Sequence, residues 1–232
     1  MMMMIRIYSF ISFFIFIIPL TLEAQQNSDL NAWTSIELTG NLPKKIALSF
    51  KIQTRFDKQI TNLRGAYYSL EASKNLKKKW SIETGLRLNT TDTWNRFRMR
   101  VGLIKKLKIN KLEVSFRALY QLRLSEFGLH ENYRNIPVST TRFKIQIQRK
   151  LIKHMKIKLF TEPLWRLESG NVYLRRIRSS VGLSYEFAKN TTAEISYLYQ
   201  PQFYPTKTIN IISFALSYDL PRKKKKDKKE KI

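Results

Sequence analysis

The sequence has 232 residues, no cysteine and a formal net charge of +26, and each of these properties narrows the class of protein. Without cysteine the chain can form no disulfide, cysteine-ligated metal site, thiol nucleophile or lipid anchor on a cysteine. A strongly basic chain can bind nucleic acid, but here the basic residues recur with the period of a strand instead of forming one patch, so we expect no nucleic-acid partner.

The N-terminal segment has the three parts of a secretory signal peptide. A single base, Arg6, precedes an apolar run from Ile7 to Leu22, and the small residue Ala24 stands before a polar stretch. This order predicts a signal peptide that is cleaved after Ala24, with an uncleaved anchor as the alternative because the run approaches the length of a spanning helix. We predict three parts in chain order: a signal peptide over 1–24, one mature domain over 25–220 and a basic, disordered tail over 221–232.

Segments in which apolar and polar residues alternate dominate the mature part. In "WNRFRMRVGL", residues 94–103, three arginines alternate with Phe97, Met99 and Val101. This period of two is typical of a strand with one apolar face, whereas a helix would need apolar residues three and four positions apart. The pattern predicts strands at 32–40, 45–56, 63–73, 80–90, 94–104, 111–124, 139–149, 155–167, 172–187, 191–203 and 208–220.

The lengths and connections of these strands favour a membrane barrel. Most are about ten residues or longer, the length that a tilted strand needs to cross a bilayer, whereas strands in soluble sheets have about five or six. Short lysine-rich turns, such as "NLPKK" and "NLKKK", alternate with more irregular links, such as "SEFGLHENYRNIP". Short turns at one end and longer loops at the other are the pattern of outer-membrane barrels. We therefore predict an all-β, antiparallel transmembrane β-barrel of about ten to twelve strands, with its short turns in the periplasm.

The number of strands leaves the place of the first one open. An eleven-stranded barrel would have its two chain ends on opposite sides, so we expect the ten strands between 45 and 220 to close the barrel. Residues 32–40 would then be an extra strand that pairs at the seam or enters the lumen. A twelfth, undetected strand is the alternative.

The bilayer determines which face of each strand points outward. Phe97, Met99 and Val101 are expected to face lipid, because a slip of one residue would expose arginines to hydrocarbon at about 2–4 kcal/mol each near the midplane. The same parity predicts a basic lumen with Arg96, Arg98, Arg100, Arg117, Arg123, Arg142, Arg176 and Arg178. Four tryptophans near strand ends fit an interfacial aromatic girdle: Trp33, Trp80, Trp94 and Trp165.

A set of motifs is spread over most of the mature chain: Arg176-x-Arg178, Gly182-x-x-Tyr185 and Glu194-x-x-Tyr197-x-x-Gln200, with Trp33 in "AWTSIEL", Gln53-Thr54-Arg55 and Arg142-Phe143. In these motifs the chain resembles a known family, the domain-of-unknown-function 2490 family. The resemblance implies an exported outer-membrane barrel of Gram-negative bacteria and implies no reaction, because the family carries no established activity. One departure is the lysine tail that follows Pro221, since in most such barrels the last aromatic strand ends the chain.

Few residues could support catalysis or bind a metal. His130 lies in the longest predicted loop near Ser125, and a serine paired with a histidine could hydrolyse a lipid, while His154 lies in a short basic turn. Neither histidine lies on a strand face that would hold such a geometry. No phosphate-binding glycine loop or two-histidine metal spacing occurs, so we predict no catalytic residue, no metal and no cofactor.

These patterns predict a non-enzymatic outer-membrane barrel, either structural or a narrow passage that prefers anions. The predicted partners are outer-membrane lipids, the barrel assembly machinery during insertion and small anions. One alternative is a lipid-modifying enzyme of the outer membrane with His130 in its outer loops. Another is a soluble periplasmic barrel that binds an apolar ligand, which requires the opposite polarity, with Phe116 inside and the arginines outside.

Overall fold

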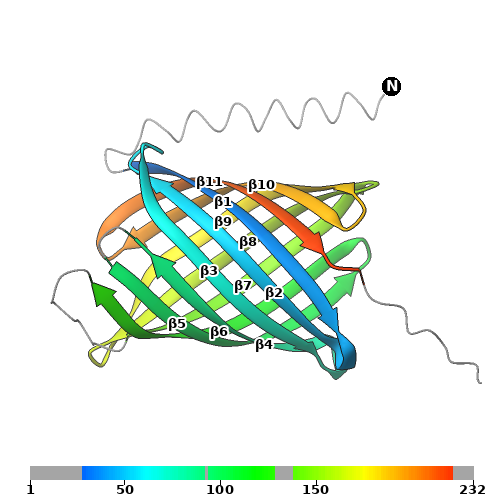
Figure 1. The fold of residues 1–232 in the computed structure, drawn as a ribbon, viewed down its shortest axis with the longest axis horizontal. Helices are drawn as coiled ribbons and strands as arrows, with labels where there is room; N and C mark the ends of the chain where they lie inside the picture. Colours follow the sequence, from blue (N-terminus) through cyan, green and yellow to red (C-terminus); the bar gives the residue numbers. More distant parts are fainter. Residues whose placement is uncertain (1–27, 92–93, 129–137, 222–232) are drawn as a thin grey trace, which may run out of the picture.

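The alternating segments form a ring because each can turn a polar face inward and an apolar face outward. The computed structural model describes residues 28–91, 94–128 and 138–221, and these residues form eleven strands closed into one barrel (Figure 1). The strands are β1 (Ser28–Leu42), β2 (Ile46–Asp57), β3 (Asn62–Asn75), β4 (Trp80–Thr90), β5 (Trp94–Ile109), β6 (Leu112–Gly128), β7 (Val138–Ile152), β8 (Met155–Glu168), β9 (Asn171–Ala188), β10 (Thr191–Phe203) and β11 (Thr206–Asp219). Two short 3-10 segments, η1 (Pro43–Lys45) and η2 (Lys77–Lys79), lie between strands.

The predicted fold class is confirmed, and the strand bounds agree closely. β4 and β10 occupy the predicted ranges 80–90 and 191–203. The largest difference at a single boundary is in β5, which continues from the predicted end at residue 104 to Ile109. The extension is explained by the sequence, because alternation continues there through Lys106, Leu107 and Lys108.

The polarity of the barrel wall is also the predicted one. Met99 and Val101 are 45% and 48% exposed, whereas Arg100 between them is only 9% exposed. On β6, Phe116 lies on the exposed face, and the next residue, Arg117, is mostly buried and forms an ion pair. A soluble barrel with an apolar interior requires the reverse arrangement, so that alternative is wrong. The apolar outer surface is the surface that hydrocarbon would cover.

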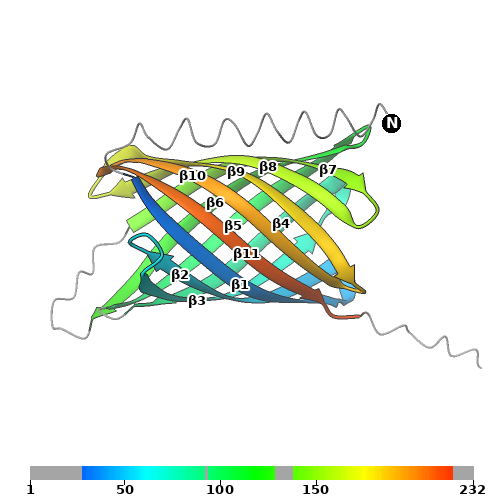
Figure 2. The same cartoon turned by 90° about the horizontal axis from the view of Figure 1, so that it is seen from above.

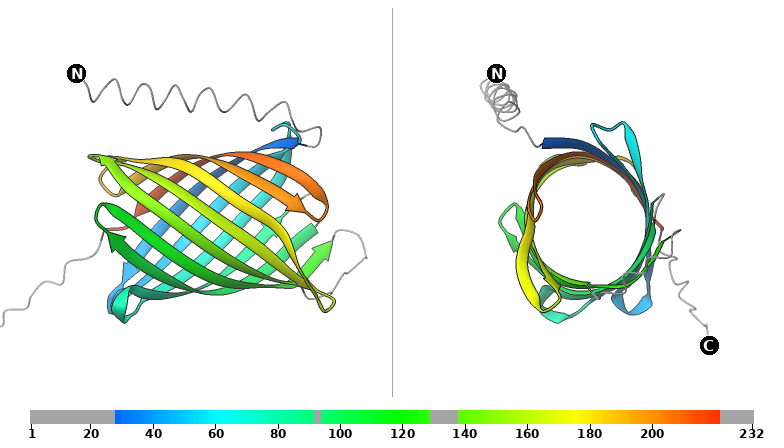
Figure 3. Two further views of the ribbon diagram at one scale, coloured as in Figure 1. Left: turned by 180° about the vertical axis from the view of Figure 1, so that it is seen from behind. Right: turned by 90° about the vertical axis from the view of Figure 1, so that its left-hand side faces the viewer.

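The closure of the barrel corrects one prediction. The ten strands after residue 45 do not close by themselves, because β1 lies between β2 and β11 as a full member of the wall (Figure 2). β1 pairs antiparallel with β2 and parallel with β11, with Ser28 opposite Thr208 and Thr39 opposite Asp219. Hairpins reverse the chain at each step, so the first and last of eleven strands run in the same direction and can pair only in parallel. Of the two positions expected for residues 32–40, the seam is the one observed, and it leaves no edge of backbone unpaired. A view along the axis shows the strands as one ring (Figure 3).

The connections at the two ends of the barrel differ, as the sequence predicted. One end, which we call the lysine end, has a lysine in or beside every turn between strands: 43–45, 76–79, 110–111, 153–154 and 189–190. The other, the loop end, has the connections 58–61, 91–93, 129–137, 169–170 and 204–205. β1 begins at the loop end and β11 finishes at the lysine end, left and right in Figure 1. Which end faces the periplasm stays a prediction.

Candidate functional site

Inward-facing arginines gather in the half of the lumen next to the loop end. A cavity of about 210 Å³ there is lined by eleven arginines, and each strand from β2 to β9 contributes at least one. No lysine, aspartate or glutamate is among the described residues that line it. We call this cavity the arginine chamber; its arginines are Arg55, Arg64, Arg87, Arg96, Arg98, Arg123, Arg142, Arg166, Arg175, Arg176 and Arg178.

Two of these arginines lie in β-bulges. In the pairing of β8 with β9 the register shifts at Arg175, and in the pairing of β2 with β3 it shifts at Arg64, so neither residue has a partner directly opposite. A bulge re-aims a side chain and breaks strict alternation. Arg175 and Arg176 therefore both line the chamber although they are consecutive. Next to Arg64, Gly65 has a φ of 138°, and a Cβ atom there would lie 2.0 Å from the backbone oxygen of Thr90. Only glycine fits this position without strain.

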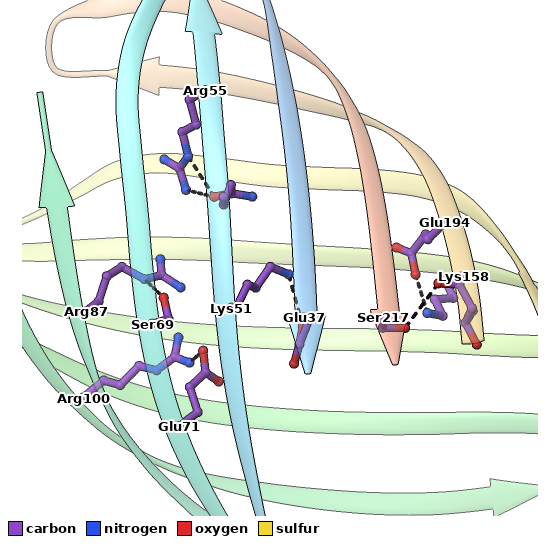
Figure 4. A network of polar contacts seen from close by, with 12 residues as sticks. Glu37, Lys51, Arg55, Ser69, Glu71, Arg87, Arg100, Lys158, Glu194 and Ser217 are labelled. Carbon is purple, nitrogen blue, oxygen red and sulfur yellow. Dashed lines mark hydrogen bonds and ion pairs between the residues drawn. The ribbon is translucent and has the colours of Figure 1, made fainter. Parts of the chain in front are cut away.

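The lumen on the lysine-end side of the chamber contains acid–base pairs, which we call the paired layer. Figure 4 shows Lys51 with Glu37, Arg100 with Glu71 and Lys158 with Glu194. A fourth pair joins Arg117 to Glu83, with 2.6 Å between Nε and Oε1. All eight side chains are at least two-thirds buried. These four pairs match opposite charges in this half of the lumen, whereas Lys144 on β7 lies over the ring of Phe160, 4.0 Å from its centroid.

Glu162 lies where the paired layer meets the chamber. Its carboxylate accepts hydrogen bonds from Arg142, 3.1 Å from Nε and 2.7 Å from Nη2, and lies 3.7 Å from the guanidinium of Arg178. Glu162 is only 3% exposed, so two chamber arginines share one deeply buried carboxylate. A bidentate contact of this kind fixes both partners in position.

Five chamber arginines make no ion pair with a described carboxylate: Arg55, Arg87, Arg98, Arg175 and Arg176. Arg55 instead donates to Gln53 at 2.9 and 2.6 Å and lies over the rings of Trp33 and Tyr67, 3.9 and 3.8 Å from their centroids. Arg87 donates to the hydroxyl of Ser69 at 2.8 Å. These neutral partners hold the guanidinium groups in place without cancelling their charge, so the chamber keeps a positive field.

The structure brings most of the predicted lumenal arginines together. Six of the eight line the chamber, and the other two, Arg100 and Arg117, belong to the paired layer. Five chamber arginines were not in the predicted set: Arg55, Arg64, Arg87, Arg166 and Arg175. Arg87 could have been found from its parity with Glu83, because both occupy the same face of β4. Arg64 and Arg175 could not have been found in this way, because each lies in a β-bulge that breaks the alternation.

The aromatic girdle needs one correction. Trp33 is not interfacial: it is buried inside the barrel, packs with Leu198, Ile209 and Ile211, and lies beneath Arg55. Its parity on β1 directs it inward, and this outweighs its position near a strand end.

The other three tryptophans remain candidates for the girdle. Trp80 is 42% exposed at the start of β4, with the Lys105 ammonium 4.8 Å from its ring. Trp165 packs edge-on against Phe143 on the outer wall. Trp94 begins β5. Their role at the membrane interface stays a prediction.

Several predictions fall on segments that the structure does not describe, namely the signal peptide over 1–24, His130 and the tail after residue 221. His154 lies in a turn at the lysine end, 3.5 Å from the Glu186 carboxylate. Within 28–91, 94–128 and 138–221, no three histidine or acidic residues are arranged to hold a metal ion. None of the helices in the described residues has the length and hydropathy to span a membrane.

Comparison with known proteins identifies relatives at the level of family and fold. The model of a family described as "Protein of unknown function (DUF2490)" matches residues 30–210. No curated protein matches the sequence. Among solved structures, the NanC porin has a TM-score of 0.52 and 13% identity, covering 83% of this chain and 99% of that chain. A structure from a study of in-meso crystallization of membrane proteins has a TM-score of 0.40 and 14% identity, covering 79% and 78% of the two chains, and is too distant to support an argument. The likeness to the porin shows a shared barrel fold.

Proposed function

This chain belongs to the DUF2490 family, and from that premise we propose that it is a non-enzymatic barrel of the outer membrane whose lumen admits small anions in preference to cations. The family description assigns no reaction, so the proposal rests on the residues of the chain itself. A porin is among the solved structures that share the fold, which supports a passage. Eleven strands enclose a narrower space than the 16 to 18 of wide porins, so the passage would be narrow.

The outer surface supports the location in a membrane. Large apolar side chains are exposed around the wall, for example Leu70 at 52%, Val101 at 48% and Phe143 at 49%. A soluble protein rarely exposes a continuous apolar surface of this extent. Its partners would be the lipids that cover this surface and, during insertion, the machinery that assembles such barrels.

The observation that carries the proposal is the composition of the arginine chamber. Eleven arginines line it with no carboxylate among the described lining residues. Rings of arginine or lysine select anions in pores, and a confined cluster of one charge sign focuses its field and raises the local concentration of counter-ions. The preference should be strongest at low salt, where screening is weakest.

A planar-bilayer experiment tests this function. When the purified barrel separates potassium chloride solutions of unequal concentration, the measured reversal potential should lie closer to the equilibrium potential of chloride than to that of potassium. The variant Arg98→Gln, Arg175→Gln, Arg176→Gln should lose part of that preference, because three chamber charges are removed while polar side chains remain. The matched control is Lys77→Gln, Lys78→Gln, Lys79→Gln, which removes the same formal charge from η2, outside the chamber.

The possible outcomes distinguish an anion-preferring passage from a structural barrel that does not conduct. Chloride preference in the wild type and the control, reduced in the chamber variant, supports the proposal. Preference for potassium contradicts it, as does an equal change in both variants. A barrel that inserts but does not conduct contradicts the passage and leaves a structural barrel.

A further inference from the structure

The basic residues of this barrel are segregated by type as well as by position. Every cation that lines the chamber is an arginine, whereas the turns at the lysine end carry lysine, as in Lys44, Lys45 and η2. Both residues bring one positive charge, so attraction of anions alone does not explain the difference. The guanidinium group presents its donors in a flat fork that matches carboxylate and phosphate oxygens, whereas the ammonium of lysine is a compact point charge.

The chamber also contains donors that lack an acceptor. The Nε atoms of Arg166, Arg175 and Arg176 are buried and have no hydrogen-bond partner among the described residues. Buried donors are almost always satisfied in proteins, and an unsatisfied one destabilises the structure. Arg175 and Arg176 are adjacent at the β9 bulge, so their donors belong to one site. An anion with several directional oxygens would satisfy them, whereas a spherical halide offers no such geometry.

Charge and size restrict the anion further. Five chamber arginines have no described carboxylate partner, so the chamber can neutralise more than one negative charge. Its volume of about 210 Å³ lies below the range of roughly 300–1,000 Å³ for sites that hold drug-sized molecules. Gln121, Thr140 and Gln202 also line it and can bond to neutral oxygens. A small solute with two or more charged groups fits these limits.

We infer that the arginine chamber is a binding site for a small multivalent oxyanion, a solute that bears two or more carboxylate or phosphate groups, held in part by Arg175 and Arg176. The inference rests on the proposed function in placing the ligand within the same lumen, but it adds a stable bound state. A passage for anions in general requires charge alone, whereas this site requires the guanidinium forks.

Calorimetric titration of the whole barrel in detergent tests the site without requiring conductance. Citrate and inorganic pyrophosphate are the probes, in a chloride buffer of constant ionic strength. The variant Arg175→Lys, Arg176→Lys keeps both charges and removes both forks, so binding should weaken by about tenfold or more. The control Arg149→Lys makes the same substitution on the exposed face of β7 near the lysine end and should leave binding unchanged. The single variant Arg176→Lys, checked for heat-modifiable gel migration, keeps the test valid if the double variant does not fold.

The results distinguish this inference from the passage. The variant Arg175→Lys, Arg176→Lys should keep the wild-type reversal potential, because the charge of the chamber is unchanged. Binding without conductance would overturn the passage and support the site. Anion preference in which citrate and pyrophosphate bind no more tightly than chloride, or bind equally well to a folded lysine variant, would overturn the site. If short-chain phosphatidic acid displaces citrate, the oxyanion is assigned to a lipid headgroup. If the lipid does not displace citrate, the oxyanion is assigned to a free solute. Either result supports the oxyanion site.

Discussion

Glu162 is the buried carboxylate that two arginines of the chamber share. It binds Arg142 through both carboxylate oxygens and lies close to Arg178. On the loop-end side of this contact arginine dominates, and on the lysine-end side acids and bases are paired. Because Glu162 is almost fully buried, its charge is stabilised by these two arginines and not by water.

Replacing this carboxylate should therefore cost more stability than replacing one in the paired layer. For Glu162→Gln we expect a loss of about 3–5 kcal/mol, since two buried guanidinium groups lose their counter-ion. The comparison is Glu37→Gln, whose partner Lys51 and own side chain are 27% and 32% exposed, and which should cost less because water still solvates part of both charges. The measurement is the temperature at which gel migration changes from the folded to the unfolded band. Equal temperatures for the two variants would show that Glu162 has no special role.

At the scale of the strand, alternation and its interruptions explain what could be predicted. Strict alternation sets the parity of β4, β5 and β6, and the predicted faces of these strands are correct because the apolar face lies on the exposed outer wall and the polar face lies in the lumen. Arg175 and Arg64 could not be assigned, since bulges depend on pairing with a neighbouring strand, which one strand's sequence does not record. Trp33 was misassigned because strand-end position was weighed without its parity. The basic lumen could thus be predicted, and its concentration into one chamber could not.

Parity on β5 makes a direct prediction. Val101→Arg should prevent assembly of much of the protein, because the charge enters the lipid-facing side near the middle of the strand at about 2–4 kcal/mol. Ile109→Arg lies on the same face of β5 at its lysine-end terminus and should be tolerated, since the cost falls to about 0–1 kcal/mol near the interface. The fraction of protein in the membrane that migrates as a folded band measures both. Similar yields of the two variants would mean that this face does not contact hydrocarbon.

For the whole molecule, the seam between β1 and β11 is the feature that sets the architecture apart. Every other neighbouring pair among the described strands is antiparallel, and this pair is parallel over twelve positions from Ser28 to Thr39. Periodicity located the strand but not its neighbours, because β1 carries the same alternation whether it closes the ring or lies inside it. Parallel pairing is slightly weaker per residue than antiparallel pairing, so the seam is the expected place for the ring to open first.

The direction of the seam can be tested with cysteines, since the natural chain has none. Ser35→Cys with Ala215→Cys should form a disulfide under mild oxidation, because these residues are directly opposite in the parallel register. Thr39→Cys with Lys207→Cys should not, because the two positions lie at opposite ends of the seam. Non-reducing gel migration distinguishes the linked form from the free form. A disulfide in the second pair and none in the first would show that β1 and β11 run antiparallel.

In the proposed membrane location, an odd number of strands also means that exactly one end of the strand sequence must be carried across the bilayer. β1 begins at one end of the barrel and β11 finishes at the other, so insertion from either side translocates one terminus and leaves the other behind. Translocating the lysine end would drag the lysines of its turns and the basic residues after Pro221 through hydrocarbon. Moving the start of β1 with the loop end carries fewer charges, and this asymmetry favours an orientation with the lysine end on the side from which the chain arrives. The arginine chamber would then open toward the outside of the cell.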